Sequence, residues 1–216
     1  MKKNLTEMVF ILDKSGSMAG LEADTIGGFN SMIERQKQAE GEALVSTVLF
    51  SNESTVIHDR VDLRKIEPLT ARQYFVGGCT ALIDAIGGAI HHIGMVHKYA
   101  REEDVPDRTI FVITTDGMEN ASHRYTSDEV KAMVKKKKEK YGWEFLFLGA
   151  NIDAVETAGS IGIRADRSAN FMPDSAGVEL SFHAVSDAIC AVQRRESVAA
   201  GWSESVENDH RKRRRR

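Results

Sequence analysis

The chain has 216 residues, 42% hydrophobic and 28% charged, with a formal net charge of −3 and only two cysteines. A chain of this length can bury a hydrophobic core without disulfides or a structural metal. Its two cysteines form neither a set of disulfides nor a CxxC metal-binding motif. No apolar run approaches the ~20 residues of a membrane span. We therefore expect a soluble, cytoplasmic protein without a membrane partner.

The charge is distributed unevenly along the chain. The last six residues, RKRRRR (211–216), are all cationic, so residues 1–210 carry −9 when this +6 is removed from the total of −3. A short cationic run of this kind is typically solvated. We therefore expect one domain over residues 1–200, followed by a polar and then basic disordered tail over 201–216.

Short apolar runs alternate along the chain with segments of helical periodicity, which predicts strands interleaved with helices. Buried strands are expected over 8–12, 44–50, 109–114 and 144–148, with an edge strand over 55–61 that forms a hairpin with 44–50. Helices are expected over 26–38, 83–100, 153–159 and 182–192, and also after a capping box at 126–129. This order predicts a three-layer α/β fold with a mainly parallel sheet.

The stretch ILDKSGSM (11–18) lies at the end of the first predicted strand and places Asp13, Ser15 and Ser17 at alternate positions. The glycine patterns of a phosphate-binding loop, a dinucleotide-binding turn and a nucleophile elbow are all absent from it. Two interpretations stay open for the stretch alone: an ordinary polar turn and a metal site.

Two more oxygen-bearing residues favour the metal site. Thr80 lies in the glycine-opened loop GGCTAL, and Asp116 follows a buried strand in TTDG. In open α/β sheets, ligands bind beyond the carboxyl ends of the strands, where these residues would gather. Mg²⁺ prefers such hard oxygen ligands, so we predict a divalent cation site formed by Asp13, Ser15, Ser17, Thr80 and Asp116.

The order DxSxS, GGxTAL–DAI and TTDG resembles the von Willebrand factor type A domain with its metal-ion-dependent adhesion site, over about residues 5 to 195. This resemblance implies a doubly wound, mostly parallel open sheet with one antiparallel edge strand and helices on both faces. It implies that the same five residues coordinate Mg²⁺ or Mn²⁺, directly or through water. The lone cysteines favour the stand-alone intracellular version found in bacteria and phages.

The resemblance also implies a function without catalysis, in which a Glu or Asp carboxylate of a partner protein completes the metal's coordination. Residues that border the metal loops are then expected to form the partner-binding rim: Met18, Glu119, Asn120, His123 and Arg124. Cys79, beside Thr80, is expected to be a small buried thiol. Switching members of the family further imply that the final helix, around 182–192, shifts when metal binds.

Two alternatives to the interaction module stay open. A Mg²⁺-dependent phosphoester hydrolase would need a general base, for which Glu119 and His123 are the best available residues. Nucleic-acid binding could use the basic tail together with the lysine run 135–138, although residues 1–210 are acidic and no recognised nucleic-acid module is present.

Overall fold

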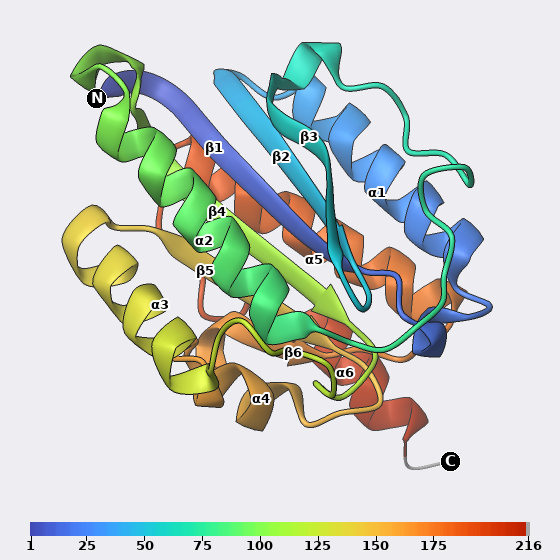
Figure 1. Cartoon of the computed structure of the whole chain (residues 1–216). Helices are drawn as coiled ribbons and strands as arrows, with labels where there is room; N and C mark the ends of the chain where they lie inside the picture. The colour runs from blue at the N-terminus through green and yellow to red at the C-terminus, as the bar shows by residue number, and fades with distance from the viewer. Residues whose placement is uncertain (215–216) are drawn as a thin grey trace.

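The computed structural model describes residues 1–214, and within them the chain folds as one α/β sandwich around a six-stranded sheet (Figure 1). The strands are β1 (Lys2–Asp13), β2 (Glu42–Phe50), β3 (Ser54–Asp62), β4 (Pro106–Thr115), β5 (Glu144–Gly149) and β6 (Ser168–Asn170). The helices are α1 (Glu22–Lys37), α2 (Leu82–Tyr99), α3 (Ser127–Tyr141), α4 (Ala154–Ser160), α5 (Ser175–Gln193) and α6 (Glu204–Arg213).

The sheet order is β3-β2-β1-β4-β5-β6, with every pair parallel except the antiparallel β2–β3 hairpin. The predicted fold class is therefore confirmed. β1 pairs with β2 on one side and with β4 on the other. The chain therefore builds the sheet outward from β1 first in one direction and then in the other, so the direction of winding reverses between β1 and β4. In such sheets, this reversal opens a crevice at the carboxyl ends of the two strands.

Alternation along the central strands divides the core into two layers. In β1, Met8, Phe10 and Leu12 pack with α1, α5 and α6, whereas Val9 and Ile11 pack with α2, α3 and α4. Both sets are fully buried, which explains why the strand reads as a continuous apolar run rather than an alternating one. Figure 1 shows α2, α3 and α4 on the near face of the sheet and α1, α5 and α6 behind it.

The predicted elements match the observed ones closely, and two differences concern the far edge of the sheet. Strand β6 is only three residues long and was not predicted. Its sequence, SAN, carries no apolar run, and its pairing with the carboxyl end of β5 positions it instead.

The capping box before α3 is confirmed, because Thr126 and Glu129 exchange backbone and side-chain hydrogen bonds.

The disordered tail predicted from residue 201 is contradicted over residues 204–213, which form helix α6. Val206 is buried in the core, and Glu207 Oε1 accepts a hydrogen bond from the backbone N–H of Asn170 in β6. The acidic first turn and basic last turn also complement the helix dipole. The end of the predicted tail, residues 215 and 216, lies outside the described residues.

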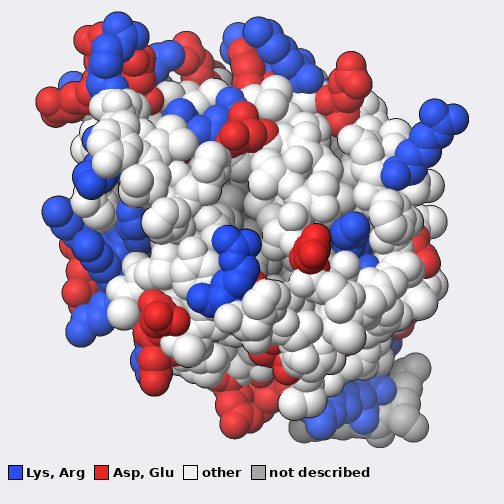
Figure 2. All heavy atoms as spheres, in the orientation of Figure 1, with Lys and Arg blue, Asp and Glu red and all other residues white. Residues whose placement is uncertain are grey.

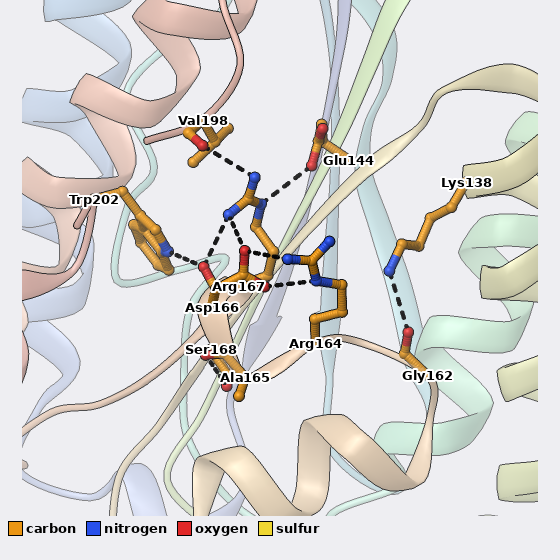
Figure 3. Close-up of polar contacts among 10 residues, drawn as sticks. All are labelled: Lys138, Glu144, Gly162, Arg164, Ala165, Asp166, Arg167, Ser168, Val198 and Trp202. Carbon is orange, nitrogen blue, oxygen red and sulfur yellow. Dashed lines mark hydrogen bonds and ion pairs between the residues drawn. The ribbon is translucent and has the colours of Figure 1, made fainter. Parts of the chain in front are cut away.

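The segment that leads into α6 is fixed to the sheet edge by a polar cluster around Arg167 (Figure 3). Arg167 Nη2 donates to the carbonyl of Val198 at 3.0 Å, and its Nε lies 3.4 Å from Glu144 Oε2. Trp202 Nε1 donates to the carbonyl of Asp166 at 3.0 Å. These bonds connect the segment to β5 and to the turn before β6, so the C-terminal helix belongs to the domain.

Among the described residues, no helix is long and apolar enough to cross a membrane.

Candidate metal centre

Asp13 is the last residue of β1, and its buried carboxylate is held from two sides. Oδ1 accepts a hydrogen bond of 2.7 Å from the backbone N–H of Ser15, and Oδ2 accepts one of 2.6 Å from the hydroxyl of Thr115 in β4. The side chain therefore bridges the two strands between which the winding reverses. Its orientation is fixed before any ligand binds.

The loop after Asp13 turns through a short 3-10 helix, Gly16–Met18, which brings its two serines together. Ser15 Oγ and Ser17 Oγ lie 3.0 Å apart. Ser15 is buried, whereas Ser17 is exposed. The spacing of two residues thus places both hydroxyls at the same end of β1, as the sequence predicted.

Thr80 lies on a loop that packs directly against the serine loop. The backbone N–H of Gly16 donates to the carbonyl of Gly78 at 3.0 Å, which joins the two loops. Gly78 has a φ of +83°, and a Cβ there would lie 2.0 Å from Asn52 Oδ1, so this position requires glycine. Thr80 itself is buried, and its backbone N–H donates to Asn120 Oδ1 at 2.9 Å.

Asp116 follows β4 and is almost completely buried, with 1% of its surface exposed. Neither carboxylate oxygen has a hydrogen-bond partner among the described residues. A Cβ on the next residue, Gly117, would lie 2.8 Å from Ser17 Oγ and 3.2 Å from Thr80 Oγ1. The hydroxyls of Ser17 and Thr80 thus converge beside Asp116, and the absence of a side chain at Gly117 leaves room for them.

The electrostatics of the two carboxylates disfavour their charged forms. Burial raises the pKa of Asp13, although the hydrogen bonds from Thr115 and Ser15 oppose the shift. Burial also raises the pKa of Asp116, and the nearby charge of Asp13 adds to it. The nearby hydroxyl of Ser17 opposes this rise in the pKa of Asp116.

These residues fit a divalent cation. A buried carboxylate without partners is costly, and a cation is the usual way in which proteins compensate it. The five predicted residues supply oxygen atoms alone, which suits Mg²⁺ or Mn²⁺ better than a soft metal. No group of three or more His, Cys, Asp or Glu side chains is placed to hold a metal among residues 1–214. A cation at this position would therefore be held by two carboxylates and three hydroxyls.

The structure contradicts one of the residues predicted for the partner-binding rim. Met18 is wrong, because it is 1% exposed and packs in the core layer of α1 and α5. Its side chain turns inward as the 3-10 helix ends. Cys79, expected to be buried, is exposed, since its loop lies on the surface above the sheet.

Glu119 is half-buried and Asn120 is exposed, and both also hold the loops of the site together. Glu119 accepts hydrogen bonds from the backbone N–H groups of Ile83, Ala121 and Ser122 and from the Ser122 hydroxyl. Glu119 therefore accepts hydrogen bonds from backbone N–H groups at the start of α2 and in its own loop. Asn120 exchanges hydrogen bonds with the backbone of Thr80, through its Oδ1 and its N–H, and so positions that threonine.

His123 and Arg124 are exposed, as expected of rim residues. Their backbone N–H groups donate to the carboxylate of Asp84 in α2. Although burial opposes it, these bonds and that of Tyr125 hold the pKa of Asp84 below its usual range. The two side chains project from a fixed loop beside the metal centre.

Several residues near the site were missed by the sequence analysis. Thr115 lies in the TTDG motif, just after the strand predicted over 109–114, and its place directly before Asp116 could have indicated it. A cavity of about 460 Å³ beside Ser17 and Asp116 is bordered by Asp24, Asn151 and Asp174. Asn151 comes just after β5, where the carboxyl-end rule could have found it.

The comparisons with known proteins support the fold. A scan of protein-family models and a search of curated proteins find no match. Solved structures of proximal thread matrix protein 1 from the mussel byssus match 86% of this chain and 46% of their own, at 12–15% identity and TM-scores of 0.57–0.59; one has a zinc-occupied MIDAS motif. Manganese-loaded TRAP protein of Plasmodium vivax matches 84% of this chain and 74% of its own, at 14% identity and a TM-score of 0.55.

The chain shares their fold. This agrees with the fold implied by the resemblance to von Willebrand factor type A domains. The chain spans less than half of the length of the mussel protein, and identities of this size establish the fold alone.

Proposed function

We propose that this chain is a metal-dependent protein-interaction domain, in which Asp13, Ser15, Ser17, Thr80 and Asp116 hold Mg²⁺ or Mn²⁺ and a Glu or Asp of a partner protein completes the coordination. The observation that carries the proposal is the buried Asp116 carboxylate, which has no hydrogen-bond partner among the described residues, next to Gly117, over which two hydroxyls converge.

The ligand set explains why an acidic partner fits. The three hydroxyls are uncharged, so only two carboxylates would offset the charge of the cation. The bound metal would supply an electrophilic position that attracts a further carboxylate oxygen. The structural neighbours that hold zinc or manganese support a divalent cation, and the oxygen-only donors favour Mg²⁺ or Mn²⁺.

The hydrolase alternative receives less support. Glu119 uses its carboxylate to accept four hydrogen bonds, and the Nδ1 atom of His123 lies 3.6 Å from Asp84 Oδ2, beside α2. Glu119 is therefore fully engaged, whereas His123 is exposed and only its Nδ1 atom lies near Asp84. A general base must be able to reach the water that it activates.

Nucleic-acid binding through the tail also receives less support. Arg213 is held by Asp174 and Asp209, so part of the basic run is engaged within the domain.

We propose the cytoplasm as the compartment and an intracellular, stand-alone domain, in keeping with the free thiols of Cys79 and Cys190.

Calorimetric titration of the purified protein with Mg²⁺ and Mn²⁺ tests the site. We expect saturable binding to the wild type, loss of binding in Asp13→Ala and Asp116→Asn, and unchanged binding in Asp24→Asn. Asp24 is a matched control because it borders the neighbouring cavity without being a predicted ligand. Partner capture from lysate should then require both metal and Asp13, and capture unaffected by chelator would contradict the proposal.

A further inference from the structure

A groove runs along the near face of the sheet, between α2 and the β2–β3 hairpin, with a volume of about 510 Å³. Figure 2 shows this face hollowed between these elements, with charged side chains around the depression. The floor is apolar, with Val9 and Val48 from the sheet and Ala85 and Ala89 from α2. We call it the α2–β3 groove.

The helix side of the α2–β3 groove is unusually open because of one residue. Gly88 lines the groove from α2, and a Cβ at this position would meet no atom within 4 Å. On the opposite wall, Val56 of β3 is 52% exposed. The groove therefore offers apolar surface on both walls to a segment that enters it.

One end of the α2–β3 groove lies next to the loops that carry the proposed metal ligands. Ala81, the residue after Thr80, lines it, as does Asn52, whose Oδ1 accepts a hydrogen bond of 2.9 Å from the Cys79 backbone. His123 and Arg124, both predicted as rim residues, border it as well. A partner segment with its carboxylate at the metal would therefore have the groove close by.

The charges around the groove favour one kind of segment. Glu53, Asp59 and Asp84 place three carboxylates around the groove, together with Arg124, His92 and His123. Asp84 already accepts hydrogen bonds from the backbone of residues 123–125, so among residues 1–214 Glu53 is the carboxylate of this set without a side-chain contact. Asp59 Oδ1 lies 2.8 Å from Nε2 of His92, which links β3 to α2 along the groove. An apolar floor with acidic margins complements aliphatic and basic side chains.

We propose that the α2–β3 groove binds an extended partner segment in which the metal-bound acidic residue is accompanied by aliphatic residues and by Lys or Arg. The inference rests on the proposed function, because the acidic residue is anchored by the metal. In such a complex the metal-bound carboxylate would supply a strong central contact, and the side-chain positions along the groove would determine which segments bind.

Selection from a library of short random peptides, each with one fixed aspartate, tests the groove in Mg²⁺ and in chelator. We expect metal-dependent enrichment of peptides that carry aliphatic and basic residues beside the aspartate. The decisive variant is Gly88→Leu, which fills the groove from an open helical position where leucine is well tolerated. The matched control is Gly159→Leu, in α4, where a Cβ also meets open space.

The selected peptides should bind Gly88→Leu at least about tenfold more weakly than the wild type, whereas Gly159→Leu and metal binding should be unchanged. Glu53→Gln should reduce the preference for basic residues. Metal-dependent peptides that bind Gly88→Leu as well as the wild type would overturn the groove and leave the metal-dependent function standing. Absence of any metal-dependent peptide would overturn the groove and count against the proposed function as well.

Discussion

The hydroxyl of Thr115 donates a hydrogen bond of 2.6 Å to Oδ2 of Asp13 and thereby joins β4 to β1 inside the metal centre. The bond lies where the winding of the sheet reverses, and both residues are buried. Because Ser15 holds the other carboxylate oxygen, the orientation of Asp13 is determined by the protein alone. Thr115 is therefore a positioning residue for the site.

Replacing Thr115 with valine should keep the shape of the side chain and remove this bond, together with the longer contacts of 3.3 Å between the hydroxyl and the backbone of Gly117. We expect a loss of about 1–3 kcal/mol in the free energy of unfolding without metal, because a buried acceptor loses its donor. Metal affinity should also fall, since Asp13 would no longer be held in one orientation. Denaturant unfolding and Mn²⁺ titration measure the two effects.

Thr114→Val is the matched control for this change. Within residues 1–214, the Thr114 side chain makes no hydrogen bond, and the residue lies one position earlier in β4. It should alter stability less and leave metal affinity unchanged. Equal metal affinity of Thr115→Val and the wild type would contradict the positioning role.

Replacing Asp116 with asparagine should separate folding from metal binding. In chelator, we expect the variant to be at least as stable as the wild type, because a buried carboxylate without partners is replaced by a neutral amide. With Mg²⁺ at about 100 times its Kd, the wild type should gain about 2.7 kcal/mol, and the variant should gain nothing. Thermal unfolding with and without Mg²⁺ measures both, and a variant that responds to Mg²⁺ like the wild type would exclude Asp116 as a ligand.

The central elements could be predicted because local patterns and tertiary packing agree there. Apolar runs such as 8–12 and 109–114 are long enough to specify buried strands, and the capping box at Thr126 specifies the start of α3. Strand β6 has three residues and α6 buries mainly Val206. Both depend on contacts with distant residues, such as that between Glu207 and Asn170, which no local pattern reveals.

In the candidate site, too, some residues could be predicted from local patterns and others could not. The proposed metal ligands follow strand ends or a glycine-opened loop, so spacing and topology predict their convergence. The rim depends on which way individual side chains turn. Met18 turns into the core, and Glu119 caps the start of α2; these outcomes are decided by loop geometry, which the sequence pattern leaves open.

Acidification should loosen the attachment of α6. The hydrogen bonds from Arg213 hold the pKa of Asp174 below its usual range. A carboxylate whose pKa is lower in the folded state stabilises the fold above its unfolded pKa of about 3.9, and this contribution is lost as pH falls through the folded value. Hydrogen exchange in α6, corrected for the intrinsic effect of pH, should therefore accelerate below about pH 4.

Arg213→Ala should accelerate exchange in α6 at neutral pH and remove most of its dependence on acid. Arg211→Ala is the matched control, because Arg211 contacts Asn208 within the same helix and not α5. If Arg211→Ala accelerates exchange as much as Arg213→Ala, the general loss of positive charge, and not the bond to Asp174, would explain the effect.

Glu7 is fully buried in the middle of β1, where a charge is expected to be costly unless it is paired. Arg60 Nε lies 3.0 Å from both of its carboxylate oxygens, and His97 Nε2 lies 2.9 Å from Oε2. Arg60→Met would remove one partner and leave the buried carboxylate with His97 alone. We expect a loss of about 3–5 kcal/mol in the free energy of unfolding, measured by denaturant titration.

The double variant Glu7→Gln, Arg60→Met should recover much of this loss, because the buried charge is removed together with its partner. Arg64→Met, at an exposed position nearby, is the control and should change stability by less than about 0.5 kcal/mol. A double variant no more stable than Arg60→Met alone would show that Arg60 contributes mainly by packing on the hairpin. Recovery would establish that Arg60 stabilises the fold by compensating the charge of Glu7.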